Sequence, residues 1–310
     1  LVRSRGLGDV YKRQVPISIV ILIGLFSLQR HGTADVGRFF GPVMILWFAT
    51  LALLGLIHIV EMPEILGAID PSYAIRFAVD RPALAFVALG SVFLCLTGAE
   101  ALYADMGHFG LPSIRVCWFF LVFPALMINY LGQGALVLTD PAASESPFFM
   151  LAPESFQFPL VILATLATVI ASQATISGAF SVTQQASRLN YLPRLRVLHT
   201  SDHSQGQIYI PIVNWILLVS VVLLVLAFKS SGALAAAYGL AVSGDLIISS
   251  VLLAVVLAHQ ESRRMRWLLI PLAAWFCLEL AFLGANLSKF FDGGWFPLTV
   301  AVSVFTCLLY

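Results

Sequence analysis

The residues best suited to chemistry are acidic side chains that lie within long apolar segments. Glu100 follows the apolar run 83–96, lies between Gly98 and Gly107, and has no lysine or arginine beside it. A charged side chain at the centre of a bilayer costs about 2.5–3.5 kcal/mol on insertion scales. Glu100 is therefore expected to be protonated, paired, or turned towards water or an ion. Each of these states favours transport over a purely architectural role.

Other acids share this setting. Asp245 and Glu279 lie inside apolar segments, and Asp105 lies at the margin of the segment that holds Glu100. No lysine or arginine accompanies them at that depth, so a salt bridge is not available from these segments. Carboxylates without bases, among hydroxyl groups, suit hard cations and protons. Potassium, sodium and protons therefore fit this chemistry, and an anionic substrate does not.

The residues before Glu100 predict a break in its helix. Gly98 lowers helix propensity, and the Thr97 hydroxyl can bond its own backbone. Broken helices leave free carbonyls in mid-bilayer, where secondary transporters bind coupling ions. Tyr103 lies on the same helical face as Glu100 and either donates to its carboxylate or only packs there. A continuous helix with a protonated Glu100 bonded to a neighbour is the alternative.

Further polar residues leave a structural and a functional interpretation open. Glu279 has leucines on both sides and is either a functional acid or a protonated structural one. Ser172 belongs to a hydroxyl-rich segment, in which small residues allow close helix packing and some hydroxyls could line a pathway. Tyr238 is a large ring among small residues, and Asp245 follows a serine and a glycine. Both are candidates for lining a pathway, with packing and local capping as alternatives.

Composition places the chain among membrane proteins. Of 310 residues, 60% are hydrophobic and 11% are charged, and the net charge of +1 indicates no nucleic-acid partner. A bilayer-spanning helix needs roughly 20 apolar residues, and these runs are too continuously apolar for barrel strands. No nucleophile–base pair, paired-metal site or cofactor motif is visible. The sequence predicts an all-α, polytopic membrane protein that is not an enzyme and needs no cofactor.

Nine apolar segments are predicted to span the membrane, the first and last of them truncated. They cover residues 15–28, 39–60, 83–109, 115–139, 159–185, 211–228, 232–258, 267–287 and 294–310. Residues 1–14 are polar, abut the first segment without turn residues, and are interpreted as a non-native leader. Residues 15–310 would then be one transmembrane domain fragment.

Charge asymmetry between alternate loops supports this topology. One set of loops holds nine basic residues and the other holds four. The richer set is Arg30, Arg38, Arg115, Arg188, Arg194, Arg196, Arg263, Arg264 and Arg266, and the poorer set is Arg76, Arg81, Lys229 and Lys289. The positive-inside rule places the richer set in the cytoplasm.

Several contiguous motifs resemble the Kup/HAK/KT potassium uptake permeases. They are Leu28–Thr33, Thr97–Gly110, Asn129–Ala135, Ile170–Ala174, Gly206–Pro211, Ala235–Gly239 and Gly293–Trp295. The resemblance implies a potassium–proton symporter of twelve spans, with a LeuT/APC-like inverted-repeat bundle. This chain would lack the first three of those spans.

The resemblance also implies roles for particular residues. The helix that begins at Thr97 would contribute to the cation site, which places K⁺ at Thr97 and Glu100, with Tyr103 beside them. The family has a functionally important buried acid in its eleventh span, usually aspartate, and Glu279 stands in that place. Asp245 stands where relatives often have a hydroxyl residue, so no role is transferred to it.

The expected function is potassium uptake across the bacterial inner membrane by proton symport, with Glu100 and Glu279 as the coupled acids. The expected partners are potassium ions, protons and the lipid bilayer, and a homodimer is compatible with the sequence. An amino-acid or polyamine permease of the same architecture is one alternative. A non-transporting membrane scaffold, in which both acids are protonated and dispensable, is another.

Overall fold

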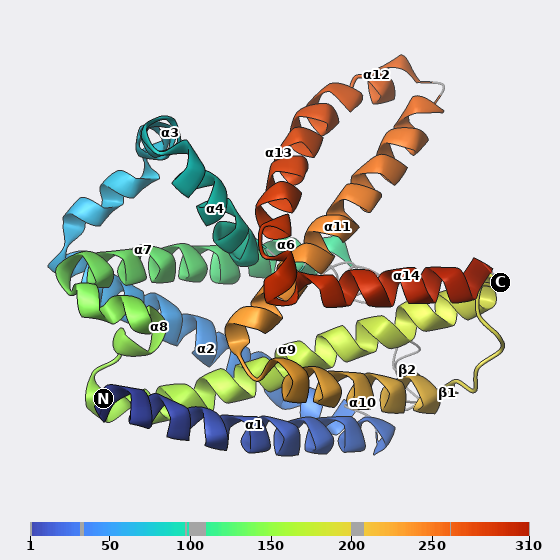
Figure 1. Cartoon of the computed structure of the whole chain (residues 1–310), viewed down its shortest axis with the longest axis horizontal. Helices are drawn as coiled ribbons and strands as arrows, with labels where there is room; N and C mark the ends of the chain where they lie inside the picture. Colours follow the sequence, from blue (N-terminus) through green and yellow to red (C-terminus); the bar gives the residue numbers. More distant parts are fainter. Residues whose placement is uncertain are drawn as a thin grey trace. The chain divides into compact units, whose positions relative to one another are not determined.

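The computed structural model describes residues 2–31, 34–96, 98, 110–199, 208–260 and 262–309. Helices dominate this part of the chain (Figure 1). Strands β1 (Leu198–His199) and β2 (Ile208–Tyr209) form a short antiparallel pair, with Leu198 opposite Tyr209. The prediction of an all-α polytopic fold is confirmed, with this two-stranded pair as a minor addition.

The helices follow one another along the chain with short connections. The α-helices are α1 (Val2–Leu28), α2 (Ala34–Glu61), α3 (Pro71–Asp80), α4 (Pro82–Val92), α6 (Leu111–Cys117), α7 (Phe123–Thr139), α8 (Pro147–Met150), α9 (Glu154–Arg188), α10 (Pro211–Phe228), α11 (Ser231–Ala258), α12 (Arg263–Arg266), α13 (Leu269–Leu287) and α14 (Trp295–Leu309). Short 3₁₀ or π turns are η1 (Gln29–His31), η2 (Pro63–Ile69), η3 (Phe93–Leu96), η4 (Trp118–Val122), η5 (Pro141–Glu145) and η6 (Phe290–Gly294).

Six helical segments in the described part of the chain are long and apolar enough to cross a bilayer. They are Phe39–Glu61, Leu111–Thr139, Glu154–Arg188, Pro211–Phe228, Ser231–Ala258 and Leu269–Leu287. Shorter apolar helices occupy Gln14–Leu28, Pro82–Cys95 and Phe290–Thr306. Each of the nine predicted segments therefore overlaps one of these helices, and the second half of the segment predicted at 83–109 lies outside the described residues. The interpretation of residues 1–14 as a leader stays a prediction, and α1 is continuously helical from Val2 into the apolar segment.

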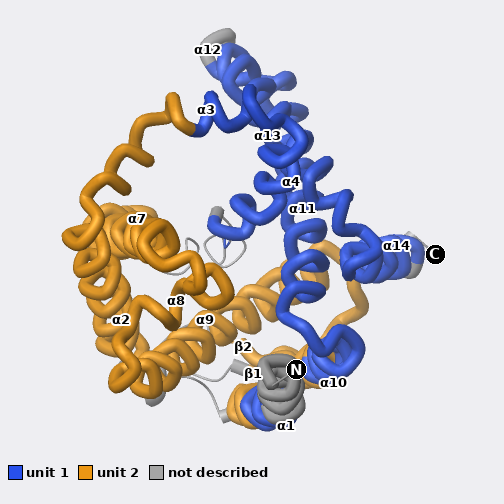
Figure 2. The backbone as a smooth tube through the Cα atoms, turned by 60° about the vertical axis from the view of Figure 1, so that its left-hand side comes forward, with its two compact units in different colours: residues 1–22, 74–98, 218–310 blue, residues 23–73, 99–217 orange. Residues whose placement is uncertain are grey.

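The chain divides into two compact units (Figure 2). The first consists of residues 1–22, 74–98 and 218–310, and the second of residues 23–73 and 99–217. In the first unit, α11 packs against α13, η6 and α14, and α4 packs against α13. Phe93, Val242 and Phe282 form the apolar centre of this packing. In the second unit, α2 packs along α7 and against α9 around Leu54 and Leu160.

Buried amide side chains connect helices within the second unit. Gln29 Nε2 donates to Gln173 Oε1 at 2.6 Å, and both side chains are buried. Asn214 Nδ2 donates to the Phe26 carbonyl at 3.1 Å. A bilayer core offers no water to satisfy such groups, so partners on neighbouring helices must do so. These contacts fix which faces of the helices meet.

The connection between α2 and α4 carries an exposed acidic turn. The backbone N–H and the hydroxyl of Ser72 both donate to the Asp70 carboxylate, at 2.9 and 2.8 Å. These hydrogen bonds, the backbone one foremost, hold the pKa of Asp70 below its ordinary value. Asp70 is thereby kept ionised at the N-terminus of α3, where a negative charge is favourable.

Glycines allow α2 and α7 to approach closely. A Cβ atom on Gly55 would lie 2.5 Å from the Ile128 carbonyl oxygen, and one on Gly132 would overlap the backbone of Gly55. Gly41 lies in the same helix as Gly55, and nothing lies within 4 Å of the position its Cβ would take. Close backbone approach through small residues is typical of helix pairs in membranes.

We predict opposite effects of alanine at these two kinds of glycine. Gly132→Ala should lower stability by about 1–3 kcal/mol, because its Cβ meets backbone that cannot rotate away. Gly41→Ala should leave stability unchanged or raise it by up to about 1 kcal/mol, because alanine is the better helix former. Thermal unfolding in detergent measures both, and equal midpoints for the two variants would contradict the close approach.

Candidate cation and proton site

The predicted cation site lies mostly outside the described residues. Thr97, Glu100, Tyr103 and Asp105 are among residues that the structure does not describe. The helix before them ends with η3 at Leu96, and Gly98 is non-helical with φ of +120°. Only glycine adopts such a backbone conformation without strain. The helix ends before Gly98, as the predicted break requires, whereas its continuation lies outside the described residues and the assignment of K⁺ to Thr97 and Glu100 stays a prediction.

Glu279 lies on the buried face of α13. The buried residues of this helix are Glu279, Phe282, Ala285 and Asn286. Their spacing of three and four residues places them along one side of the helix. That side packs against α11 and α4 within the first unit, which explains why Glu279 is only 3% exposed. The sequence prediction of an acid buried within a span is confirmed for this residue.

The carboxyl group of Glu279 is only half satisfied. The Ser250 hydroxyl on α11 donates to Glu279 Oε1 at 2.9 Å, and Ser250 is itself buried. Glu279 Oε2 is buried and has no hydrogen-bond partner among the described residues. The described residues also provide no ion pair to this carboxyl group. Leaving a buried acceptor unpaired costs about 1–3 kcal/mol, and more when the group is charged.

Two further buried polar residues, Asn286 on α13 and Ser243 on α11, lie on the same two helices. Asn286 is buried and donates from Nδ2 to the Phe282 carbonyl at 3.0 Å. A Cβ on Gly239 would lie 2.6 Å from Asn286 Oδ1, so glycine is required where this side chain meets α11. Ser243 is buried on α11 and donates to the Gly239 carbonyl at 2.7 Å.

Sequence reasoning missed Ser250 and Asn286, although a spacing signal exists. Ser250 follows Ser243 by seven residues, and Asn286 follows Glu279 by seven. Residues seven apart occupy nearly the same side of a helix, two turns from one another. The spacing alone does not identify the buried face, because Tyr238 and Asp245 are also seven residues apart on α11 and are exposed.

The residues proposed to line a pathway occupy different environments. Tyr238 is 40% exposed and Asp245 is exposed, so both lie away from the buried face of α11. Ser172 is half-buried on α9, and its hydroxyl donates to the Thr168 carbonyl of its own helix at 2.8 Å. The structure therefore does not bring Tyr238 or Asp245 to the Ser250–Glu279 pair, and their roles stay predictions.

Basic and metal-ligating groups do not gather at this site in the part of the chain that the structure describes. Lys289 Nζ donates to Ser91 Oγ at 3.3 Å. Lys289 follows Glu279 by ten residues, which is about 15 Å along a helix axis. The described residues contain no cluster of three or more His, Cys, Asp or Glu that could hold a metal ion. The chemistry available at Glu279 is therefore that of one carboxyl group and one hydroxyl.

These features define a multi-pass α-helical membrane protein with a buried acid between two of its spans. Residues 5–310 match the family model of the K⁺ potassium transporter integral membrane domain, and the chain belongs to this family.

Curated relatives carry the same assignment. The chain is 53% identical over 298 residues to the probable potassium transport system protein Kup of Polaromonas naphthalenivorans (strain CJ2), covering 96% of this chain and 48% of that protein. It is 55% identical over 296 residues to the probable potassium transport system protein Kup 1 of Dechloromonas aromatica (strain RCB), covering 95% and 47%. The chain thus spans about half the length of the curated relatives it matches. No solved structure matches it.

The bond between Ser250 and Glu279 makes a stability prediction. Ser250→Ala should lower stability by about 1–3 kcal/mol, because Glu279 then loses its hydrogen bond while still buried. Replacing both partners, in Ser250→Ala with Glu279→Leu, should recover part of this loss. The measurement is the midpoint of thermal unfolding in detergent.

Ser243→Ala is the matched control, because Ser243 is also buried on α11 but bonds only its own helix. Its effect should be smaller than that of Ser250→Ala. A midpoint for Ser250→Ala that equals the control would show that the Ser250–Glu279 bond contributes nothing to stability.

Proposed function

We propose that this chain is part of a potassium uptake system of the bacterial inner membrane, driven by proton symport. Its family and its relatives, which are named as potassium transport proteins, support potassium as the substrate. The observation that carries the proton part is the half-satisfied carboxyl of Glu279, buried between α11 and α13. An ionisable group at membrane depth marks an ion pathway or a proton relay in most membrane proteins.

The coupling follows from the charge of that carboxyl group. When protonated, Glu279 is neutral and its burial costs little. When deprotonated, it carries a charge in a low-dielectric setting with one hydroxyl as its partner, so burial of this form is costly. The closed state that carries the potassium ion across the membrane therefore needs Glu279 protonated, and opening to the cytoplasm would release the proton and the ion on the same side, as symport requires.

We infer that the cation itself is held where the helix breaks after Leu96. Thr97 and Glu100 would supply oxygen ligands, with Tyr103 beside them, and a non-helical segment would leave backbone carbonyls free for the same purpose. The φ of +120° at Gly98 supports this inference, since it ends the regular helix at that point. Oxygen ligands suit a hard cation.

The broken helix also supports an inverted-repeat architecture of the LeuT/APC type. In such transporters, discontinuous helices bring their ends to the ion site near the middle of the bilayer. The helix that breaks at Gly98 would open the second repeat. Its partner helix from the first repeat would lie upstream of this chain's spans.

A transport assay tests the proposal. Residues 15–310 would replace the matching region of the full-length Dechloromonas aromatica relative, in cells that lack other potassium uptake systems. Glu279→Gln should reduce rubidium uptake at low external potassium about tenfold or more, because an amide cannot release a proton. Glu100→Gln should also abolish uptake, because it removes a charged cation ligand.

Glu279→Asp is the control, because it keeps an ionisable carboxyl at the same buried position. It should leave uptake within about twofold of the parent, a difference of less than 0.5 kcal/mol at about 1.4 kcal/mol per tenfold. Full uptake by Glu279→Gln would contradict the proton role, and full uptake by Glu100→Gln would contradict the cation site. Uptake that amino acids inhibit competitively would contradict potassium as the substrate.

A further inference from the structure

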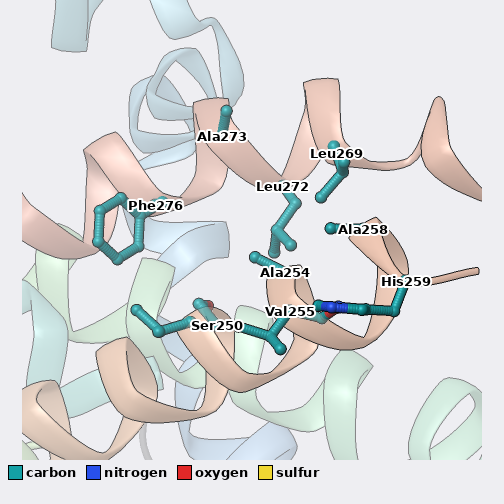
Figure 3. A pocket seen from close by; sticks show the side chains of 10 residues that line it. Ser250, Ala254, Val255, Ala258, His259, Leu269, Leu272, Ala273 and Phe276 are labelled. Carbon is teal, nitrogen blue, oxygen red and sulfur yellow. The ribbon is translucent and has the colours of Figure 1, made fainter.

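A groove runs between α11 and α13 towards the end that carries α12 (Figure 3). Its volume is about 550 Å³. The residues that matter to its chemistry are Ser250, Ala254, Val255 and His259 on the α11 side and Leu272 and Phe276 on α13. Its walls are apolar over almost their whole length, so the groove suits a hydrocarbon ligand and does not suit water or a polar solute.

The two ends of the groove differ in polarity. Ser250 lies at the inner end, and its hydroxyl is already committed to Glu279 Oε1. His259 lies at the outer end, just beyond α11, with its Nδ1 2.8 Å from the Val255 carbonyl oxygen. The groove therefore leads from the polar connection between α11 and α13 to the buried Ser250–Glu279 hydrogen bond.

The connection at the outer end is basic. Residues 259–266 contain Arg263, Arg264 and Arg266 and one acid, Glu261. Arg266 Nε donates to the Gln260 carbonyl at 3.0 Å, which holds α12 against the residue that follows His259. Trp267 comes next and is 61% exposed, as is typical of an aromatic residue at the headgroup level. The segment that follows the outer end of this apolar groove in the chain is therefore rich in arginine.

We propose that this groove binds an anionic phospholipid, with one acyl chain between α11 and α13 and the phosphate at the α12 connection. A groove between two membrane spans is open to the lipid tails of the bilayer. Its volume falls within the range of small-molecule binding sites. Basic residues beside a membrane span attract anionic headgroups, by about fivefold in affinity for each arginine. The end of the acyl chain would cover Ser250 and keep lipid-side water from Glu279.

This site depends on the membrane location of the chain and not on the transported substrate. An acyl chain alone would not discriminate among lipids, whereas the arginines select for negative headgroups. The phospholipid in the groove is therefore distinguished from the surrounding lipid by its negatively charged headgroup.

Photolabelling tests the proposal. The 310-residue chain would be reconstituted into vesicles that contain a trace of phosphatidylglycerol or phosphatidylcholine with a photoreactive group near the acyl terminus. Mass spectrometry of the labelled peptides locates the adducts. Phosphatidylglycerol should label residues 250–259 and 269–276 at least about fivefold more than phosphatidylcholine.

Two variants separate the groove from the charge. Ala254→Trp fills the groove and should remove most of this labelling, whereas Leu252→Trp, on the exposed side of the same helix, should retain it. Arg263→Gln with Arg264→Gln leaves the groove intact and should lower the preference for phosphatidylglycerol by about fivefold or more. If Ala254→Trp does not fold, the double arginine variant tests the proposal alone, and an unchanged preference for phosphatidylglycerol would contradict it.

Three results would overturn the proposal. One is equal labelling by the two lipids, and another is equal labelling of the two tryptophan variants when both are folded. The third is cross-linking between the grooves of two chains with loss of lipid labelling, which would show that a second copy occupies the groove.

Discussion

The hydrogen bond from Ser250 to Glu279 expresses the constraint on which the fold depends: a polar group inside the bilayer must find its partner within the protein. The same constraint governs the Gln29–Gln173 pair and the bond from Asn214 to the Phe26 carbonyl. Apolar contacts between helices give little preference for one rotation of a helix over another, because lipid tails are equally apolar. The buried polar side chains therefore decide which faces meet.

Close backbone approach is what makes these polar contacts reachable. Gly239 leaves room for the Asn286 side chain, and Gly55 and Gly132 let α2 and α7 touch through their backbones. Asn129, on α7 beside this contact, donates from Nδ2 to the Leu51 carbonyl at 3.3 Å. Small residues and buried amides thus occur together, since a short side chain spans the gap only where the helices are close.

Glu279 departs from this rule in a way that points to function. Most buried polar groups in the described residues have a partner, whereas Glu279 Oε2 and Asn214 Oδ1 have none. An amide oxygen left unpaired costs stability and gains no chemistry. A carboxyl oxygen left unpaired can take up a proton, so the same structural cost leaves a site that changes charge.

The sequence predicted the features that depend on local composition. Continuous apolar runs marked the helices that the structure contains, and the glycine before Glu100 marked the place where the preceding helix ends. The burial of Glu279 followed from its position within such a run.

The partners of these residues were not predictable in the same way. Ser250 meets Glu279 because of how α11 and α13 are rotated and shifted along each other, which depends on packing between segments distant in sequence. Asp245 and Tyr238 lie on the exposed side of α11 for the same reason, although their types alone suggested a pathway. The seven-residue spacing of Ser243 and Ser250 matches the buried face, but Tyr238 and Asp245 have the same spacing on the exposed face.

The central claim is that Glu279 is protonated in the closed state that carries potassium across the membrane. Infrared difference spectroscopy on the reconstituted full-length chimera measures this directly, because protonated and ionised carboxyl groups absorb at different frequencies. The account predicts that potassium addition, which favours the loaded closed state, raises a protonated carboxyl band and that this change is absent in Glu279→Gln. A potassium-induced spectrum without a carboxyl change, or with the same change in Glu279→Gln, would contradict it.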